Sequence, residues 1–113
     1  MHEITLCQSL MRIIDNQLRE RGRTRVKKVR LEVGALVAVE PQALRFGFRA
    51  VSRGTQAEGS ALEILIVPGR GWCVPCEAER EMLRYGSGCP VCGTVMLPRG
   101  GGDMLRVKEL EVE

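Results

Sequence analysis

The chain has 113 residues, a formal net charge of +3 at pH 7, and 44% hydrophobic but only 4% aromatic residues. This length fits one ordinary domain, or a small domain with a metal-stabilised insert, and it supplies enough apolar side chains for a core. No apolar run approaches the roughly 18 residues of a membrane-spanning helix, and the N-terminus lacks a secretory signal pattern. We therefore expect a cytoplasmic protein with no membrane partner, and the mild positive charge is weak evidence for nucleic acid binding.

The first expected element is an amphipathic helix of about 16 residues near the N-terminus. Gly22 is a suitable residue to end it. Cys7 belongs to the apolar face, so we expect a small buried thiol there rather than a fifth metal ligand. The apolar residues recur at spacings of three and four: Ile4, Cys7, Met11, Ile14 and Leu18, with Leu10 and Ile13 widening the stripe.

A basic tract follows this helix and allows two explanations. We favour a solvated turn and strand over a docking patch. No aromatic residue is interleaved for base stacking, which weakens a nucleic-acid interpretation further. The cationic residues, opposed only by Glu20, are Arg19, Arg21, Arg23, Arg25, Lys27, Lys28 and Arg30.

Two strands and a second helix are expected next. Pro41 suits the first turn of a helix, and Glu40 stands just before it. Gly47 allows a neighbouring element to approach this helix closely. The inward positions of the helix are Leu44, Phe48 and Val51, and the alternating apolar residues of the strands are Val29, Leu31 and Val33, then Leu62, Ile64 and Ile66.

The strongest signal in the chain is a pair of Cys-x-x-Cys motifs separated by twelve residues: Cys73-Val74-Pro75-Cys76 and Cys89-Pro90-Val91-Cys92. Each motif directs two sulfurs into one turn, and two facing turns complete a tetrahedral site that suits zinc best and iron second. Gly93 permits the tight turn after the second motif. Two disulfides or a redox motif are the alternatives, and paired motifs without a secretory signal disfavour both.

A site with four sulfur ligands has no open coordination position, so we expect this zinc to be structural. Residues 68–102 are too few to bury a self-sufficient core, and such metal binding contributes on the order of 10 kcal/mol or more to folding. Four thiolates on one Zn²⁺ leave a charge of about −2. The arginines expected to balance it in part are Arg70, Arg80, Arg84 and Arg99.

A last strand is expected after the insert. Leu105 and Val107 occupy one phase of its alternation, whereas Leu110 and Val112 occupy the other. A strand whose apolar phase slips by one residue indicates a β-bulge, here near Lys108.

The predicted order is helix, strand, helix, strand, zinc insert, strand. It indicates an α+β fold with a small mixed three-stranded sheet, two helices and an inserted four-cysteine lobe like a zinc ribbon. Residues 1–67, completed by a strand in 103–113, form one domain, and residues 68–102 form the zinc domain. The simplest topology makes the last two strands antiparallel and the first two parallel or non-adjacent.

Little catalytic chemistry remains, so we do not expect an enzyme. The only histidine is His2, and no glycine-rich phosphate loop follows a strand. The terminal amine of Met1, the amide nitrogen of residue 2 and the imidazole of His2 can form fused chelate rings around one metal. Such planar, nitrogen-rich binding suits Ni(II) or Cu(II), and Glu3 offers an oxygen nearby.

Together these motifs resemble the HypA/HybF family, nickel metallochaperones of NiFe-hydrogenase maturation. The resemblance covers essentially the whole chain, and the order and spacing of the motifs are more specific than any one alone. It rests on Met1-His2-Glu3-Ile4, a helix, a basic turn, Val33-Gly34-Ala35, Glu40-Pro41 before Leu44-Arg45-Phe46, and the two cysteine motifs.

The resemblance implies a nickel site centred on His2, completed by neighbouring backbone nitrogens from Met1 onward, with Glu3 as a ligand or beside one. Glu40 matches an acidic position of the family and also suits a helix start. The resemblance carries zinc binding to Cys73, Cys76, Cys89 and Cys92.

It also implies partnership with the GTPase HypB and the NiFe-hydrogenase large subunit, and in some bacteria service to urease. The glycine-rich passages beside the insert suggest a monomer, or a weak or domain-swapped dimer. Two rival functions remain open from the residues. A zinc-ribbon nucleic-acid adaptor predicts steep salt dependence and indifference to His2, and a purely structural interaction protein predicts no specific nickel uptake.

Overall fold

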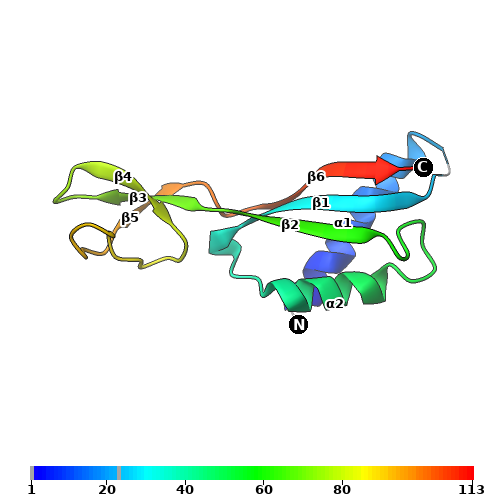
Figure 1. Ribbon diagram of the computed structural model, residues 1–113, viewed down its shortest axis with the longest axis horizontal. Coiled ribbons are helices and arrows are strands. Elements are labelled where there is room, and N and C mark those ends of the chain that lie inside the picture. Colours follow the sequence, from blue (N-terminus) through cyan, green and yellow to red (C-terminus); the bar gives the residue numbers. More distant parts are fainter. Residues whose placement is uncertain (1, 23) are drawn as a thin grey trace. The chain divides into compact units, whose positions relative to one another are not determined.

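A computed structural model describes the chain except for Met1, Arg23 and the side chain of His2. Among the described residues, no helix is both long and apolar enough to span a membrane. The predicted α+β class is confirmed (Figure 1). The elements are helices α1 (His2–Arg19) and α2 (Pro41–Val51), the 3-10 helix η1 (Ala35–Val37), and strands β1 (Val26–Gly34), β2 (Ala61–Val67), β3 (Gly69–Cys73), β4 (Ala78–Met82), β5 (Leu97–Gly100) and β6 (Leu105–Val112).

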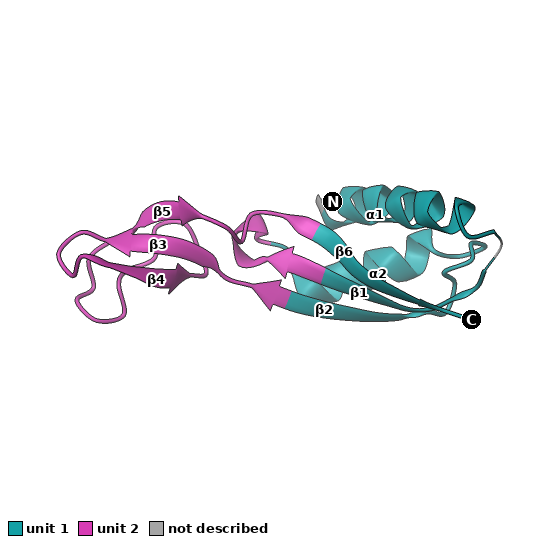
Figure 2. Cartoon of the chain, turned by 90° about the horizontal axis from the view of Figure 1, so that it is seen from above, with its two compact units in different colours: residues 1–31, 39–65, 106–113 teal, residues 32–38, 66–105 magenta. Residues whose placement is uncertain are grey.

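These elements form two compact units (Figure 2). Unit 1 contains residues 1–31, 39–65 and 106–113, and unit 2 contains residues 32–38 and 66–105. The strands β1, β2 and β6 contribute residues to both units.

Unit 1 is built on a sheet with the strand order β2-β1-β6. The strands β1 and β2 run in the same direction and β6 in the opposite one, so the sheet is mixed as predicted (Figure 2). The last two strands therefore run in opposite directions, but β1 lies between them. The central position suits β1 because its Val29 and Leu31 are fully buried, whereas Leu65 of β2 is 40% exposed.

Both helices lie on one face of this sheet, and their apolar faces form the core of unit 1 (Figure 2). Ile13 is an exception to the predicted stripe, because it remains 39% exposed. At Gly47 an added Cβ would lie only 3.0 Å from the Cys7 sulfur, so the predicted close approach is present. The buried core residues are Cys7, Leu10, Met11, Ile14 and Leu18 of α1, Val26, Val29 and Leu31 of β1, and Leu44 and Phe48 of α2.

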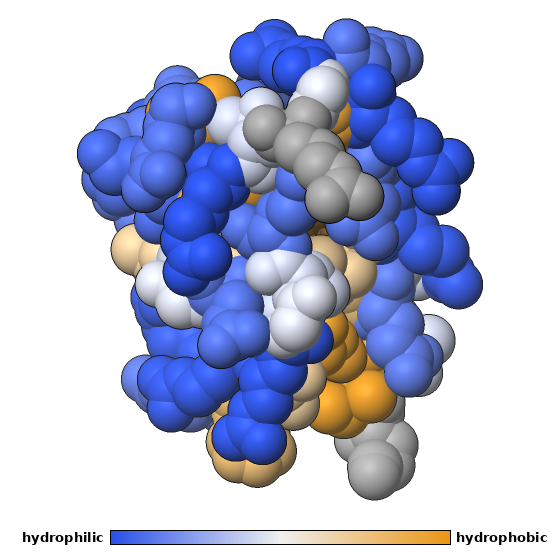
Figure 3. Space-filling model, turned by 90° about the vertical axis from the view of Figure 1, so that its right-hand side faces the viewer, coloured by the Kyte–Doolittle hydropathy of each residue, from blue (hydrophilic) through white to orange (hydrophobic). Residues whose placement is uncertain are grey.

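Charged residues form a ladder across the other face of the sheet. Arg30 of β1 donates from Nε to Glu63 of β2 at 2.7 Å and from Nη1 to Glu109 of β6 at 2.9 Å. Lys28 likewise lies 3.1 Å from Glu63 and 4.0 Å from Glu111. Glutamates thus pair with Lys28 and Arg30 of the basic tract, as a solvated strand requires. The end of the molecule that lies on the right in Figure 1 is also mostly hydrophilic (Figure 3).

Unit 2 contains a second three-stranded sheet, in the order β4-β3-β5, with both pairs antiparallel. Its buried cluster is small and consists of Cys73, Met82, Cys89 and Met96. The cysteine motifs predicted a zinc-ribbon-like insert here, but no sequence pattern predicted its individual strands. The reason is physical: β4 and β5 are short and show no clear alternation of apolar residues.

Three backbone segments of unit 2 meet at Gly102. Its φ is +66°, and an added Cβ would lie 2.4 Å from the backbone nitrogen of Gly69. The N–H of Leu36 donates to the Gly102 carbonyl oxygen at 2.8 Å. Only glycine can adopt this backbone conformation and also allow such a close backbone contact. The glycine-rich segment at the end of the insert is therefore a place where backbone segments pack tightly against one another.

Candidate metal centre

Two turns of unit 2 place the four predicted cysteines. Cys73 is the last residue of β3, and Cys76 lies in the turn that leads into β4. Cys89 and Cys92 flank a second turn, in which the N–H of Gly93 donates to the Cys89 carbonyl oxygen at 2.8 Å. Gly93 has a φ of +82°, as the sequence predicted for this position.

The four sulfur atoms all lie within 4.8 Å of one another. The Cys73 and Cys92 sulfurs are 3.4 Å apart, and those of Cys76 and Cys89 are 3.9 Å apart. A tetrahedral zinc ion with Zn–S bonds of about 2.3 Å requires sulfurs about 3.8 Å apart, so this donor set fits zinc. All four cysteines are free of disulfides.

Two of the thiols are poised to ionise. The backbone N–H groups of Cys92 and Val91 lower the pKa of Cys89 to about 6, with smaller help from the Arg80 side chain. Hydrogen bonding with the hydroxyl and backbone of Thr94 lowers the pKa of Cys92. Because the thiolate is the form that binds metal, these contacts favour binding at neutral pH.

The remaining two thiols have different surroundings. The backbone N–H of Cys76 favours the Cys73 thiolate, but burial and hydrogen bonds with the other three thiols outweigh it and raise the Cys73 pKa to about 12. A divalent cation held by the cluster would remove this barrier, because coordination deprotonates a thiol. The sulfur set therefore ionises most readily together with metal binding.

The arginines expected near the cluster divide into different roles. Hydrogen bonds to Cys89 and Cys76 raise the pKa of Arg80, which places its cation beside the sulfurs. Arg70 instead pairs with Glu79 at 2.9 Å. The positions of these arginines in the sequence could not distinguish their roles. The contact of Thr94 with Cys92 was likewise not predicted, because the only sequence signal for it is that Thr94 lies two residues after a cysteine.

Arg84 and Arg99 are engaged elsewhere in unit 2. The guanidinium carbon of Arg99 lies 4.4 Å above the centre of the Trp72 ring. Arg84 uses its backbone N–H to contact the Ser87 hydroxyl at 3.2 Å. Neither contact involves a sulfur atom. Of the four arginines, Arg80 is therefore the one whose side chain interacts with the cysteine cluster.

The predicted nickel residues fall partly outside the described structure. Met1 and the side chain of His2 are not among the described residues, although the His2 backbone begins α1. The structure brings together Glu3 and Glu40, which are 37 positions apart: the N–H of Glu40 donates to Glu3 Oε2 at 3.3 Å. Glu40 also caps α2, because its Oε2 accepts from the N–H of Ala43 at 2.7 Å.

Cys7 is a buried thiol in the core of unit 1, as predicted. Its Sγ donates to the carbonyl oxygen of Leu44 at 3.3 Å. Burial, with the charge of Glu3, raises the pKa of this thiol and disfavours the thiolate. Cys7 therefore acts as a small apolar residue, consistent with its place on the inner face of α1.

Comparison with known families finds a match along nearly all of the chain. The model of the family described as "Hydrogenase/urease nickel incorporation, metallochaperone, hypA" matches residues 1–112. The "Hydrogenase maturation factor HypA" of Acidithiobacillus ferrooxidans is 47% identical over 113 residues, which cover 100% of both chains. Proteins of the same name from Azotobacter vinelandii and Dechloromonas aromatica are 45% and 42% identical, also over 100% of both chains.

Solved structures share the fold. The solution structure of the Ni metallochaperone HypA from Helicobacter pylori superposes with a TM-score of 0.67 at 19% identity, covering 99% of this chain and 97% of that one. A second HypA solution structure gives a TM-score of 0.64 at 18% identity, covering 100% of this chain and 97% of that one. At these identities the likeness concerns the fold.

Proposed function

The chain belongs to the HypA family of hydrogenase/urease nickel-incorporation metallochaperones, and from this premise we propose that it binds Ni(II) at its N-terminus and delivers it during NiFe-hydrogenase maturation. The observation that carries the proposal is the family match over residues 1–112, which includes the Met1-His2-Glu3 start. Nickel is the cargo in this proposal, and the protein is a carrier rather than a catalyst.

The proposed nickel ligands are the Met1 amine, the amide nitrogen and imidazole of His2, and the carboxylate of Glu3 or a group beside it. The first N–H groups of a helix have no intrahelical partner, so the amides at the start of α1 can bind metal without breaking a helical hydrogen bond. Planar nitrogen donors suit Ni(II).

The charges around the proposed site favour both the binding and the release of Ni(II). The positive end of a helix dipole disfavours a cation, and α1 begins at the proposed site. The carboxylate of Glu3 opposes that effect, and it is positioned by the N–H of Glu40. The Glu40 carboxylate already caps α2 by accepting from Ala43. We therefore propose that Glu40 supports the nickel site from nearby, and we favour this role over a direct bond from Glu40 to nickel.

The four-cysteine centre is proposed to hold Zn²⁺ through Cys73, Cys76, Cys89 and Cys92, on the strength of their sulfur spacing. A closed thiolate site leaves no position for substrate, so the zinc would be structural. We propose residues 1–67, with the strand in 103–113, as the nickel domain and residues 68–102 as the zinc domain.

The family suggests the partners. We propose that the chain acts with the GTPase HypB and donates nickel to the NiFe-hydrogenase large subunit, in the cytoplasm. Recognition of urease components is a second possibility within the same family description.

A nickel titration of untagged, zinc-loaded protein tests the proposal. Wild-type protein should take up Ni(II) with the absorption band of a planar site, and His2→Ala should abolish that band while the zinc content is unchanged. Gln8→Ala is the matched control, because Gln8 is exposed further along α1. Undiminished planar binding in His2→Ala would contradict the proposal, and salt-sensitive nucleic acid binding indifferent to His2 would favour an adaptor instead.

A further inference from the structure

The solvent-facing side of α2 carries an aromatic ring and a row of arginines. Phe46, Arg49 and Arg53 stand three and four positions apart, so they form one stripe that continues just past the end of the helix at Val51. Phe46 is 69% exposed, and both arginines are exposed as well. Arg45 lies beside Arg49, on the side of α2 that contacts β2. We call Arg45, Phe46, Arg49 and Arg53 the α2 face.

The positive charge of the α2 face has no carboxylate partner in the part of the chain that the structure describes. Arginines one helical turn apart repel each other. Arg49 and Arg53 form no ion pair with a described residue, and Arg45 donates from Nη1 to the carbonyl oxygen of Leu62, which is uncharged. An anion bound from outside the chain would therefore relieve the repulsion along this row.

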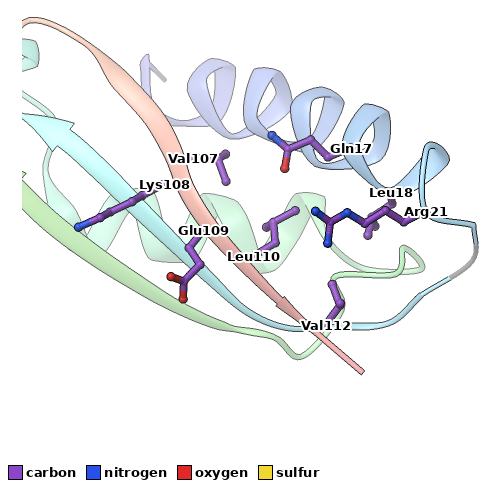
Figure 4. A pocket seen from close by; sticks show the side chains of 8 residues that line it. All are labelled: Gln17, Leu18, Arg21, Val107, Lys108, Glu109, Leu110 and Val112. Carbon is purple, nitrogen blue, oxygen red and sulfur yellow. The ribbon is translucent and has the colours of Figure 1, made fainter.

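Cations elsewhere in unit 1 lie close to carboxylates. Lys28 and Arg30 pair with glutamates across the sheet. A groove of about 280 Å³ between α1 and β6 is lined by Arg21 and Lys108, but the acidic Glu109 lines it too (Figure 4). The α2 face differs from both places, because no described carboxylate pairs with its arginines.

A pocket of about 400 Å³ lies beside Arg45 and Arg49, and the described residues that line it include no acidic one. The carbonyl groups at the end of α2, which would repel an anion, already accept hydrogen bonds. The Phe48 carbonyl oxygen accepts from the N–H of Ser52 at 2.9 Å, and that of Arg49 accepts from the Ser52 hydroxyl at 3.3 Å. The surroundings of the two guanidinium groups therefore favour a bound oxyanion.

Phe46 favours a protein segment over a small anion as the occupant. The other phenylalanine of the chain, Phe48, is 3% exposed and belongs to the core, whereas Phe46 presents its ring to solvent among arginines. Aromatic and arginine side chains carry much of the binding energy at protein interfaces. A small anion would leave the ring in water, whereas an apolar side chain of a partner would cover it.

The spacing of the α2 face matches an extended peptide. In an extended chain every second side chain points to the same side, at intervals of about 6.7 Å. Neighbouring positions of the stripe on α2 are about 5–6 Å apart, and the long arginine stems can span the difference. A segment with the pattern apolar-x-acidic-x-acidic therefore places its apolar side chain on Phe46 and its carboxylates on Arg49 and Arg53.

We propose that the α2 face docks an extended acidic segment of a partner protein, with the pattern apolar-x-acidic-x-acidic. A single-stranded nucleic acid fits less well, because such sites present several rings to successive bases and the α2 face presents one. Docking requires neither bound nickel nor the side chain of His2. The helix nevertheless starts at Glu40, whose N–H donates to Glu3, so a docked partner lies on the helix that begins beside the proposed nickel ligands.

A fluorescence anisotropy titration of a labelled peptide with nickel-free, zinc-loaded, full-length protein tests the proposal. The peptide has the sequence leucine-serine-glutamate-serine-glutamate with blocked ends. Wild-type protein should bind it saturably, and less tightly as salt is raised. Arg49→Glu should raise the dissociation constant about tenfold or more, because it replaces an attraction by a repulsion. Phe46→Ala should raise it about fivefold, as expected for an interface anchor.

Matched controls separate docking from general effects of charge and stability. Arg21→Glu makes the same charge change on α1, at the groove of Figure 4, and should leave peptide binding unchanged. His2→Ala should also bind the peptide as the wild type does, which separates docking from the proposed nickel site. A peptide with glutamines in place of both glutamates should not bind. Helical circular dichroism verifies the fold of each variant, and Arg49→Gln takes the place of Arg49→Glu if the latter unfolds.

Several results would overturn the proposal. Wild-type protein that does not bind the peptide would do so, and so would equal losses of binding in Arg49→Glu and Arg21→Glu. Tighter binding of a single-stranded oligonucleotide than of the peptide, at the same salt concentration, would assign the α2 face to nucleic acid instead. Displacement of the peptide by an equal concentration of inorganic phosphate would show a site for a small anion rather than for a protein segment.

Discussion

Unit 1 completely buries Leu10, Ile14, Leu31 and Leu44, whereas the buried cluster of unit 2 consists of Cys73, Met82, Cys89 and Met96. Two of those four residues are proposed zinc ligands. Burying one large aliphatic side chain contributes roughly 1.5–3 kcal/mol, so unit 1 can be held by its core. Unit 2 has no comparable set of buried aliphatic residues, so a metal ion held by the four cysteines would have to supply the folding free energy that its small core does not.

The largest expected effect is the loss of unit 2 in Cys89→Ser. Removing one thiolate should release the bound zinc and with it on the order of 10 kcal/mol of folding free energy. Metal analysis should find no zinc, and amide signals of residues 69–100 should lose dispersion. The helices of unit 1 should persist, because their core residues do not bind the metal. Global loss of helical circular dichroism would contradict separate stabilisation of the units.

The next largest effect is expected at the start of the chain. An imidazole-free N-terminal extension converts the Met1 amine into a peptide nitrogen, so Ni(II) binding should fall by at least tenfold until the extension is removed. Zinc content should not change, because the thiolate centre is closed. Calorimetric titration before and after cleavage provides the measurement, and equal nickel affinity in both forms would place the site elsewhere.

Two carboxylate variants sharpen the same test. Glu3→Gln should weaken nickel binding more than Glu40→Gln, because the Glu40 carboxylate accepts from Ala43 at the start of α2 while the Glu3 carboxylate is held by the Glu40 N–H. Each variant keeps the size of the side chain, so the paired titrations isolate the charge. The reverse ranking would assign the direct contact to Glu40.

A substitution in the helix packing of unit 1 should lower the stability of unit 1 and leave unit 2 unchanged. In Gly47→Val the added side chain meets the Cys7 sulfur, since even a Cβ would lie 3.0 Å away, and overpacking of this kind costs about 1–3 kcal/mol. Ala50→Val on the exposed side of α2 is the control for helix propensity. Denaturant unfolding followed by helical signal should show the loss, with zinc still bound, and Cys7→Ala should recover part of it by making room.

The smallest effect concerns the charge ladder of unit 1. Hydrogen bonds from Arg30 and Lys28 hold the pKa of Glu63 below its ordinary value of 4.5. A lowered folded-state pKa means that ionised Glu63 stabilises the fold fully above pH 4.5, and that this contribution is lost as pH falls through the lowered value. Glu63→Gln should therefore reduce the acid sensitivity of unit 1 below pH 4.5, in unfolding titrations across that range.

Glu20→Gln is the matched control for this titration. Glu20 is exposed in the same unit and makes no ion pair with a described residue. Glu20→Gln should leave the fall in the free energy of unfolding below pH 4.5 the same as in the wild type. An identical change in both variants would show that the ladder does not set the acid sensitivity.

Local patterns in the sequence determined much of this protein. Spacings of three and four predicted α1, alternation predicted β1 and β6, and Glu40-Pro41 marked the start of α2. The two Cys-x-x-Cys motifs predicted which sulfurs would meet, because their geometry is set within each turn. These signals are reliable because each depends on neighbours a few residues away.

Tertiary structure alone decided the rest. The placement of β1 between β2 and β6 depends on which strand buries its side chains most fully, and the meeting of Glu3 with Glu40 depends on the packing of α1 on α2. The selection of Arg80 among four nearby arginines follows from the pairing of β3 with β4. Such contacts join distant residues whose separation in space is set only when the whole core packs, so no local spacing in the sequence records them.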